Sequence, residues 1–415
     1  MKIAIVVNTF PSLSETFILD QITGLIDAGH DVDILSFCRP KAAGKVHDEV
    51  AAYRLLERTT YFDIPRDHAG RITKALIVVA KYMLTYPGTI LRCLRLSTGR
   101  ELGRLTRILT LEPFLRKHYD IVHCHFGVNA LRCLFLKELF NMKLVTSFHG
   151  YDISRVLKND GEDIYRELFA RGDLFLPVSA FFRERLLRLG CPADKTKVFF
   201  IGIKVGQFPF RDNPAGSGRM VRILTVGRLV AKKGIAYALK AVQQVTAAVN
   251  DIEYVIVGDG EEKAPLEALA QQLQIDGKVR FKNGMSRLEV QQLLRECDVF
   301  VLPSITTDDG DQEGIPGVLK EAMASGVPVI STDHAGIPEM ITDGENGFLA
   351  PEKDSAALAE KILYCIRHPG RCREVARAAR ACVEKIFDAD RLNQDLEAHY
   401  QRLLLGSKGS LLTQT

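Results

Sequence analysis

The sequence predicts an α/β protein with two doubly wound parallel sheets that face each other across a cleft. Short apolar runs alternate with amphipathic helical patterns along almost the whole chain, which is the pattern of repeated strand–helix units. At 415 residues the chain is too long for a single core. A segment rich in glycine and proline, residues 202–219, divides the apolar runs into two sets and is the expected interdomain linker.

Strands are expected at six places on each side of this linker. The first set is residues 3–8, 31–37, 120–126, 143–149, 173–179 and 197–202, and the second is 222–227, 253–260, 279–284, 299–304, 328–333 and 347–350. Ligands of such sheets bind at the carboxyl ends of the strands. We expect a first domain over residues 1–205, a second over 206–387, and a C-terminal amphipathic helix with a loose tail over 388–415.

A helical segment interrupts the alternation between residues 67 and 117, where two or three helices are expected. Its basic side chains, set among leucines and isoleucines, are Arg92, Arg95, Arg100, Arg104, Arg107, Arg116 and Lys117. Basic amphipathic helices can rest on an anionic membrane surface. The pattern also fits an insertion packed on the first sheet with its arginines in water, so both interpretations stay open.

The composition is that of a soluble globular chain. Hydrophobic residues make up 47% of it, and the formal net charge of +4 is too small to indicate a nucleic-acid partner. Nine scattered cysteines without a CxxC pair fit reduced thiols better than disulfides or a zinc site. The first residues read as a strand, and the most apolar stretch, residues 75–86, is too short to span a bilayer. We expect a cytoplasmic protein, either free or peripheral on the inner face of the cell membrane.

The turn after the first strand, within Asn8–Gln21, contains no glycine. Ser12 and Glu15 have the S-x-x-E spacing of a capping box, which predicts Ser12 as the N-cap with the Glu15 side chain folded back. The buried stripe of the following helix is expected at Phe17, Ile18, Ile22, Leu25 and Ile26.

The densest set of chemically informative residues lies between Val299 and Leu349. An acidic loop at 306–312 is followed by Glu313, by a segment flanked by glycines at 314–317, and by a helix that contains Glu321. Free backbone N–H groups at the start of such a helix suit a phosphate. The two carboxylates would repel phosphate and are better placed to accept hydrogen bonds from the hydroxyl groups of a sugar and a ribose.

This stretch resembles the E-x7-E signature of the retaining glycosyltransferases of family 4, which have the two-domain GT-B fold. The resemblance covers most of the chain, and within this family the chain is similar to bacterial exopolysaccharide and colanic-acid-type glycosyltransferases. It implies that Glu313 contacts hydroxyl groups of the donor sugar and that Glu321 binds the ribose. The donor site implied here also includes Gly314, Ile315, Pro316, Gly317 and Val318.

A basic turn follows the first strand of the second domain. Beside Gly227, Arg228 and Lys233 flank a short loop, so two cations could converge on a diphosphate. The resemblance implies that this arginine and lysine neutralise the donor pyrophosphate. Lys232 competes for the same role, although the spacing favours Lys233.

Later turns of the second domain are expected near the nucleotide base. Glycines there permit close backbone approach, and the residues concerned are Gly258, Gly260, Asn283 and Gly284. No P-loop pattern occurs in the sequence, which disfavours phosphate hydrolysis of that kind.

Three histidines are candidates in the first domain. His149 ends a predicted strand, and the resemblance implies that it reaches the donor sugar beside the reacting centre. His123 and His125 alternate on one face of another strand. His125 is either a cleft-lining residue or a structural one. We expect no metal, because no third ligand accompanies this pair and GT-B enzymes generally work without one.

Many relatives have a glycine pair in the first turn, and this chain departs from that pattern. We therefore expect the diphosphate to be held from the second domain and the first turn to face the acceptor. The candidate acceptor-side residues are Ser14, Glu15, Thr16 and His125.

The resulting hypothesis is a retaining hexosyltransferase of exopolysaccharide or cell-surface polysaccharide synthesis. Its donor would be a UDP- or GDP-linked sugar acting as co-substrate with no cofactor, and its acceptor an oligosaccharide or a polyprenyl-diphosphate-linked glycan. The leaving phosphate oxygen would deprotonate the acceptor, as the family mechanism proposes. The alternatives are a nucleotide-sugar epimerase, a soluble glucoside or sucrose-type synthase, and a non-catalytic nucleotide-sugar binding protein.

Overall fold

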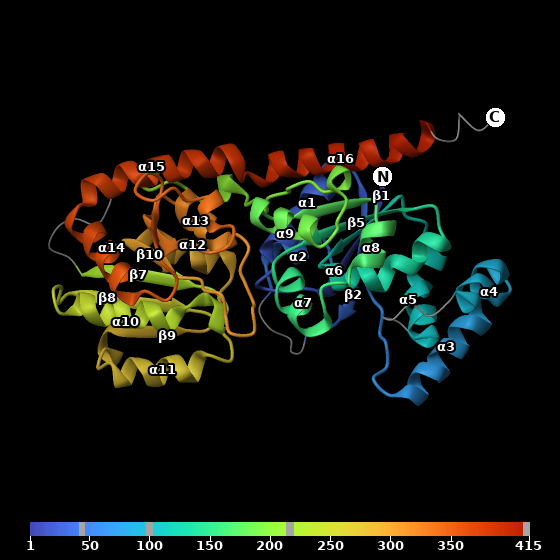
Figure 1. The fold of residues 1–415 in the computed structure, drawn as a ribbon, viewed down its shortest axis with the longest axis horizontal. Helices are drawn as coiled ribbons and strands as arrows, with labels where there is room; N and C mark the ends of the chain where they lie inside the picture. The colour runs from blue at the N-terminus through green and yellow to red at the C-terminus, as the bar shows by residue number, and fades with distance from the viewer. Residues whose placement is uncertain (41–45, 97–102, 213–219, 410–415) are drawn as a thin grey trace.

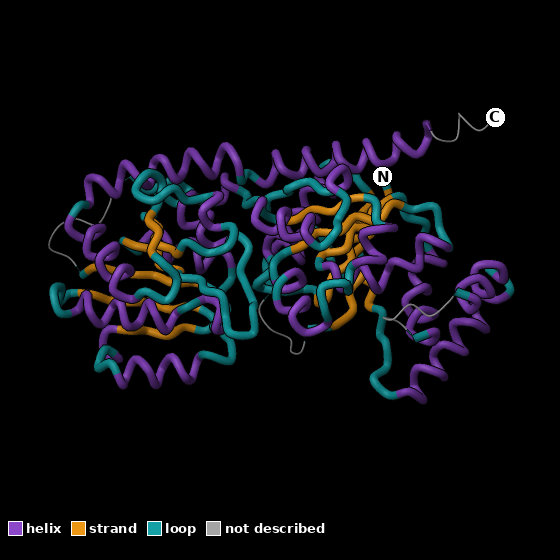
Figure 2. The backbone as a smooth tube through the Cα atoms, in the orientation of Figure 1, coloured by secondary structure: helices purple, strands orange, loops and turns teal. Residues whose placement is uncertain are grey.

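The structure is a computed structural model that describes residues 1–40, 46–96, 103–212 and 220–409. Among these residues it contains two six-stranded parallel sheets, each covered by helices on both faces (Figures 1 and 2). The predicted architecture of two doubly wound parallel sheets is confirmed. The domain limits 1–205, 206–387 and 388–415 stay a prediction.

The first sheet has the strand order β3-β2-β1-β4-β5-β6. Its strands are β1 (Lys2–Thr9), β2 (Asp31–Cys38), β3 (Thr59–Tyr61), β4 (Ile121–His125), β5 (Lys143–Phe148) and β6 (Leu174–Pro177). The strand order reverses beside β1, where Ile3 pairs with Val32 on one side and with Ile121 on the other. Ligands of such sheets bind at this switch point.

One predicted strand of the first set is wrong. Residues 197–202 form no regular strand, because they contact β6 only through a bridge at Thr196 and the Lys197 and Phe199 amides. The edge position is instead occupied by β3, which is three half-buried residues long and carries no apolar run to predict it.

The second sheet has the order β12-β11-β10-β7-β8-β9. Its strands are β7 (Val221–Val226), β8 (Ile252–Val257), β9 (Val279–Lys282), β10 (Val299–Leu302), β11 (Val329–Thr332) and β12 (Phe348–Ala350). All six coincide with predicted strands. Their side chains are mostly buried because helices cover both faces, which explains the continuous apolar runs.

Helices connect the strands of both sheets. In the first domain they are α1 (Thr16–Asp27), α2 (Asp48–Ala52), α3 (His68–Met83), α4 (Pro87–Arg95), α5 (Arg104–Arg116), α6 (Gly127–Cys133), α7 (Arg155–Asp160), α8 (Arg166–Arg171) and α9 (Ala180–Arg188). In the second they are α10 (Ile235–Thr246), α11 (Lys263–Gln272), α12 (Arg287–Glu296), α13 (Gly317–Ala324), α14 (Ser355–Arg367), α15 (Pro369–Ile386) and α16 (Ala389–Gly409). Short 3-10 helices are η1 (Leu134–Glu138), η2 (Tyr151–Ile153), η3 (Ala193–Lys195), η4 (Val205–Gln207), η5 (Ala231–Lys233), η6 (Asp276–Lys278) and η7 (Ile337–Glu339).

The last helix returns to the first domain. α15 lies along the second domain, and α16 continues in the same direction over the first (Figure 1). There Leu396 and Tyr400 are fully buried in the core formed by β1 and α1. The predicted returning helix is therefore present, and it extends into the predicted loose tail as far as Gly409. The rest of that tail, 410–415, lies outside the described residues.

The helical insertion is also present, as α3, α4 and α5. α5 is mostly buried and packs against α3 and α6, whereas α3 and α4 project from the first domain (Figure 1). Arg107 is buried, and Arg100 lies outside the described residues. Among the described helices, none combines the length and apolar character needed to cross a membrane.

The predicted capping box of the first helix is wrong. α1 begins at Thr16, so its N-cap is Glu15 and not Ser12, and within the described chain no side chain caps it. The Ser12 hydroxyl instead lies 3.3 Å from that of Ser14. Within the described residues, the polar side chains of this turn therefore do not cap the start of the helix.

Candidate functional site

The two domains meet at the carboxyl ends of β5 and β10, where two glycines let the backbones touch. Gly150 follows β5 with φ +127°, and a Cβ there would lie 2.8 Å from the Gln312 carbonyl oxygen. A Cβ at Gly314 would lie 3.2 Å from the His149 carbonyl oxygen. This contact brings His149 of the first domain beside Glu313 of the second, as the sequence prediction requires.

Two lysines hold the carboxylate of Glu313. Its Oε2 lies 3.0 Å from Lys233 Nζ, and its Oε1 lies 3.4 Å from Lys232 Nζ, with all three side chains largely buried. Burial alone would raise the pKa of this carboxyl, but the Lys233 and Lys232 ammonium groups outweigh it and hold the pKa well below its usual range. Sequence spacing favoured Lys233 over Lys232, whereas the structure places both lysines on the same carboxylate.

The lysines are positioned by a tight approach of backbones. Both lie in η5, which ends at Gly234 with φ +64°. A Cβ at Gly234 would lie 1.9 Å from the Pro303 carbonyl oxygen, so only glycine fits between η5 and the end of β10. Burial lowers the pKa of Lys233, and Glu313 acts in the opposite direction.

Sequence reasoning missed the histidine that orients Glu313. The Glu313 amide donates to His334 Nε2 at 3.0 Å, and His334 Nδ1 lies 2.6 Å from Glu352 Oε1. Because Nε2 accepts, the proton is on Nδ1 and is donated to the carboxylate. His334 follows β11 in the run STDHAG, a strand end that could have been searched for polar residues.

Arg228 of the second domain interacts electrostatically with Glu15 of the first. Arg228 follows β7 and is exposed to solvent. Burial raises the pKa of the Glu15 carboxyl to about 7, and the positive charge of Arg228 opposes that shift. The carboxyl of the opening turn is thus close enough to sense the cation assigned to the donor diphosphate.

A stack of three buried imidazoles leads to the site. His123, His125 and His149 have ring centroids 4.8 and 5.2 Å apart in sequence, and His125 Nδ1 lies 3.0 Å from His149 Nε2. Burial holds the pKa values of all three below their usual range, so the rings are neutral. The predicted shared face of His123 and His125 is confirmed.

The far end of this stack is fixed by α16. His123 Nδ1 accepts from Gln21 Nε2 at 3.1 Å and lies 2.6 Å from the Tyr400 hydroxyl, while Nε2 lies 2.7 Å from the Ser147 hydroxyl. At the near end, His149 Nδ1 is buried and has no hydrogen-bond partner among the described residues. His125 Nε2 is likewise buried without a partner among the described residues, so these two nitrogen atoms of the stack can still bond to a ligand.

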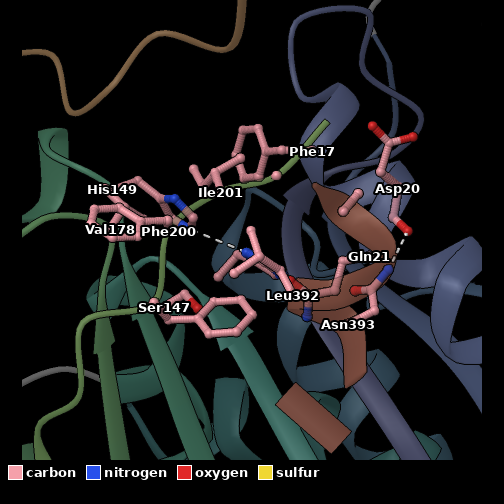
Figure 3. Close-up of a pocket in the computed structure, with 14 residues that line it drawn as sticks. Phe17, Asp20, Gln21, Ser147, His149, Val178, Phe200, Ile201, Leu392 and Asn393 are labelled. Carbon is pink, nitrogen blue, oxygen red and sulfur yellow. Dashed lines mark hydrogen bonds between the residues drawn. The ribbon is translucent and has the colours of Figure 1, made fainter. Parts of the chain in front are cut away.

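A small cavity lies on one side of His149, between the first domain, the linker and α16 (Figure 3). Phe17, His149 and Val178 border it, together with Leu392 and Asn393 of α16. Glu313, Arg228 and Lys233 do not line it. The cavity is therefore adjacent to the proposed donor site and separate from the cationic residues.

Glu321 lies near a buried ion pair that joins the domains. Arg287 Nη1 and Nη2 donate to the two carboxylate oxygens of Asp20 on α1 at 2.9 and 2.8 Å, and Nη1 also donates to Gln207 at 2.8 Å. Burial raises the pKa of Glu321 to about 7, with Arg287 acting in the opposite direction. Next to it, Lys320 is fully buried and donates to the carbonyl oxygen of Ile201, just before the linker, at 2.7 Å.

Two of the predicted base-binding glycines are explained by packing within the domain. A Cβ at Gly258 would lie 1.8 Å from the Gly227 carbonyl oxygen, and one at Gly260 would lie 2.2 Å from that of Leu229. These glycines therefore let the β7 and β8 turns meet. Gly284 donates its amide to Asp259 at 2.7 Å, and the Asn283 side chain accepts from Lys263 at 2.5 Å.

The start of α13 has the predicted form. Pro316 is its N-cap, Gly317 and Val318 are its first residues, and Ile315 is buried beneath them. At the opening turn, Ser14 is exposed and Thr16 begins α1. Glu15 and Ser12 line a second small cavity.

The acidic loop 306–312 contacts the first domain. Arg155 Nε lies 3.0 Å from Asp309 Oδ2, and the Arg185 guanidinium donates to the Gln312 side chain at 3.0 Å. Lys232 lies 3.2 Å from Asp311 in the same loop. Within the described residues, no group of three or more His, Cys, Asp or Glu side chains is arranged to hold a metal ion.

Comparisons with known proteins find similar glycosyltransferases over nearly the whole chain. A family model described as Glycosyltransferase Family 4 matches residues 14–207, and one described as Glycosyl transferases group 1 matches residues 212–381. The chain is 35% identical over 417 residues to the amylovoran biosynthesis glycosyltransferase AmsK of Erwinia amylovora, covering 97% of this chain and 100% of AmsK. It is also 35% identical to the putative colanic acid biosynthesis glycosyltransferase WcaL of Salmonella typhimurium, with the same coverage.

Solved structures share the fold at low identity. HepE of Anabaena, crystallised with UDP and glucose, superimposes with a TM-score of 0.72 at 18% identity, covering 97% of this chain and 99% of HepE. The sucrose-phosphate synthase of Thermosynechococcus elongatus gives a TM-score of 0.75 at 18% identity, covering 98% of this chain and all of that protein. These neighbours are GT-B glycosyltransferases, which confirms the predicted fold class.

Proposed function

This chain belongs to glycosyltransferase family 4, and from that membership we propose that it transfers a hexose from a nucleotide-diphosphate sugar, with retention of configuration, to a hydroxyl group of a growing lipid-linked oligosaccharide. Relatives at 35% identity named for amylovoran and colanic acid biosynthesis support an exopolysaccharide role. Neighbours crystallised with UDP and with UDP-glucose support a nucleotide-sugar donor.

The observation that carries the proposal is the pairing of Glu313 with two lysines, beside His149 and the N-terminus of α13. In this proposal the donor diphosphate takes up the positive charge of Arg228 and Lys233 and the free amides at the start of α13. Glu313 keeps its negative charge, so it accepts hydrogen bonds from sugar hydroxyls and orients the sugar. His149 Nδ1 bonds to the same sugar from the other domain.

Cationic side chains of the protein stabilise the negative charge that develops on the leaving nucleoside diphosphate. As the bond between the sugar and the diphosphate breaks, Lys233 and Arg228 stabilise the negative charge on the departing phosphate. The acceptor hydroxyl attacks on the same face, and its proton passes to that phosphate oxygen. Since fixed cations already neutralise the diphosphate, we propose that the reaction needs neither a metal nor a cofactor.

The acceptor is assigned to the side of the opening turn. The positive charge of Arg228 acts on Glu15 from the second domain, and Glu15 and Ser12 line a small cavity of the first domain. Hydroxyl and carboxyl side chains are suited to bind sugar hydroxyls. We place Ser14, Glu15 and Thr16 next to the acceptor, with His125 acting behind His149.

The test is a panel of UDP- and GDP-linked sugars, in which binding and slow donor hydrolysis are measured for the wild type and for Glu321→Gln. A transferase should bind one donor best and release its nucleoside diphosphate, and the variant should lose most of that turnover. An epimerase would instead interconvert sugars on the intact nucleotide. Binding without any release would indicate a non-catalytic protein.

A further inference from the structure

We propose that the outer face of helices α3 and α4 docks on an anionic phospholipid bilayer. This inference deepens the proposed function, because a lipid-linked acceptor would be reached from such a surface. The surface is defined here as residues 66–96, which is the whole of α3 and α4 with the residues that flank them. Four observations on this surface carry the inference: exposed apolar side chains, excess positive charge, position in the molecule, and repulsion between like copies.

The outer face of α3 is apolar although it faces solvent. Ile72, Leu76, Ile77 and Leu84 are exposed by 40, 63, 60 and 93%, while the opposite face, formed by Ala75, Val78 and Tyr82, is buried toward α5. Ile72 and Leu76 are four residues apart, so they lie on the same side of the helix, and Leu84 follows its last turn. Six of the fourteen exposed large hydrophobic side chains of the described chain fall between residues 72 and 91. Such clustering marks an interaction surface.

The same surface concentrates positive charge. Residues 66–96 contain six lysines and arginines and one aspartate, which gives +5, while the whole chain carries only +4. Several of these cations donate to backbone carbonyl oxygens. Because a carbonyl oxygen carries no net charge, these bonds do not neutralise the positive charge of the side chains. Lys74 donates to that of Asp63, Arg92 to that of Glu138 and Arg71 to that of Pro65.

The position of the surface leaves it accessible. α3 and α4 project from the first domain on the side away from the second domain, clear of α16 (blue to cyan in Figure 1). An exposed helical surface that carries leucine and isoleucine together with basic side chains can lie in a membrane interface, with apolar side chains among the acyl chains and cations at anionic headgroups.

A second copy of this chain fits the surface less well. A two-fold dimer would bring two identical faces together and set +5 against +5. The bilayer satisfies both features at once, because it offers a liquid apolar phase beneath a negatively charged layer. The charge therefore selects a lipid surface over self-association.

The experiment is flotation of the full chain with vesicles of phosphatidylcholine alone or mixed with phosphatidylglycerol. We expect binding to the mixed vesicles, a loss of about tenfold for Leu76→Ser combined with Ile77→Ser, and a loss of about fivefold for Arg95→Gln. The matched controls are Leu56→Ser, at a leucine exposed by 55% elsewhere in the first domain, and Arg373→Gln on α15. Both should bind like the wild type.

Two results would overturn the inference. One is equal vesicle binding by the wild type and the Leu76→Ser/Ile77→Ser variant. The other is a dimer in lipid-free sedimentation that this variant dissociates, which would assign the surface to a second copy. Donor hydrolysis in lipid-free solution should be the same in all these variants. It therefore reports on the proposed transferase separately, and either claim can fail while the other stands.

Discussion

Replacing Arg287 with leucine should destabilise the protein by about 3 kcal/mol. Arg287 is 7% exposed and Asp20 is 2% exposed, and two hydrogen bonds of 2.9 and 2.8 Å join them across the domain interface. Removing one partner of a buried pair leaves an uncompensated charge, which typically costs about 3–5 kcal/mol. The lower value is expected because burial already raises the pKa of Asp20, so this carboxyl can take up a proton instead of staying charged.

The assay is urea denaturation near pH 8 for Arg287→Leu, Asp20→Asn and the double variant. The double variant should lose less than the sum of the single variants, because both single changes remove the same Arg287–Asp20 interaction. The penalty of Arg287→Leu should shrink as the pH falls and Asp20 is protonated. Arg39→Leu, which breaks the exposed pair of Arg39 with Asp63, is the control and should have no resolvable effect. The reasoning is refuted if Arg287→Leu behaves like this control, or if the three effects simply add.

Four further outcomes are expected at the candidate site. Lys233→Ala should lower kcat for donor turnover by about a hundredfold or more, and an unchanged rate would remove this lysine from the mechanism. His125→Phe keeps the stacked ring but removes the 3.0 Å bond to His149, so kcat should fall about tenfold with little change in donor KM; equal kcat would make His125 purely structural. Since burial raises the pKa of Glu321 to about 7, donor KM should fall as this carboxyl ionises between pH 6 and 8. Glu321→Gln should abolish this pH dependence of KM. Glu15→Gln, which changes the other carboxyl with a pKa of about 7, should keep it. Prior treatment with EDTA should leave the rate unchanged, and loss of activity restored by a divalent cation would refute the proposal that no metal is needed.

The stability contribution of Glu321 has a defined sign. Its folded pKa, about 7, lies above the ordinary value of 4.5, so the folded state holds a proton that the unfolded state has released between these values. This group therefore lowers stability as the pH rises from about 4.5 to 7. In the proposed role of Glu321 as a ribose acceptor, its carboxylate form is obtained at a cost in folding free energy, which bound donor would offset.

Much of the fold could be predicted because buried parallel strands are read directly from apolar runs. β10 and β11 are fully buried on both faces and were found without error. β3 was not predicted because its three residues are only half-buried. Residues 197–202 were predicted as a strand because they are apolar, but Phe199 packs with residues of α16 and Phe200 packs in the core of the second domain. The capping box at Ser12 failed because the S-x-x-E spacing does not fix where a helix begins.

The candidate site was predictable where one segment carries the chemistry, as with Glu313 and the start of α13. What the sequence could not supply are partners far apart in the chain. Arg287 and Asp20 are 267 residues apart, and His123 and Tyr400 are 277 apart, so no local pattern connects them. The pairing of both Lys232 and Lys233 with one carboxylate likewise depends on a close approach at Gly234 that only the fold creates.

The most direct test of the central claim is the configuration of the sugar released during slow hydrolysis of an α-linked nucleotide sugar. Proton NMR should resolve the anomers before they interconvert. If the site holds the donor between His149, Glu313 and Lys233 for a retaining transfer, the α-anomer should appear first, and Lys233→Ala should slow its release. First appearance of the β-anomer, or release at the same rate in the variant, would contradict the account.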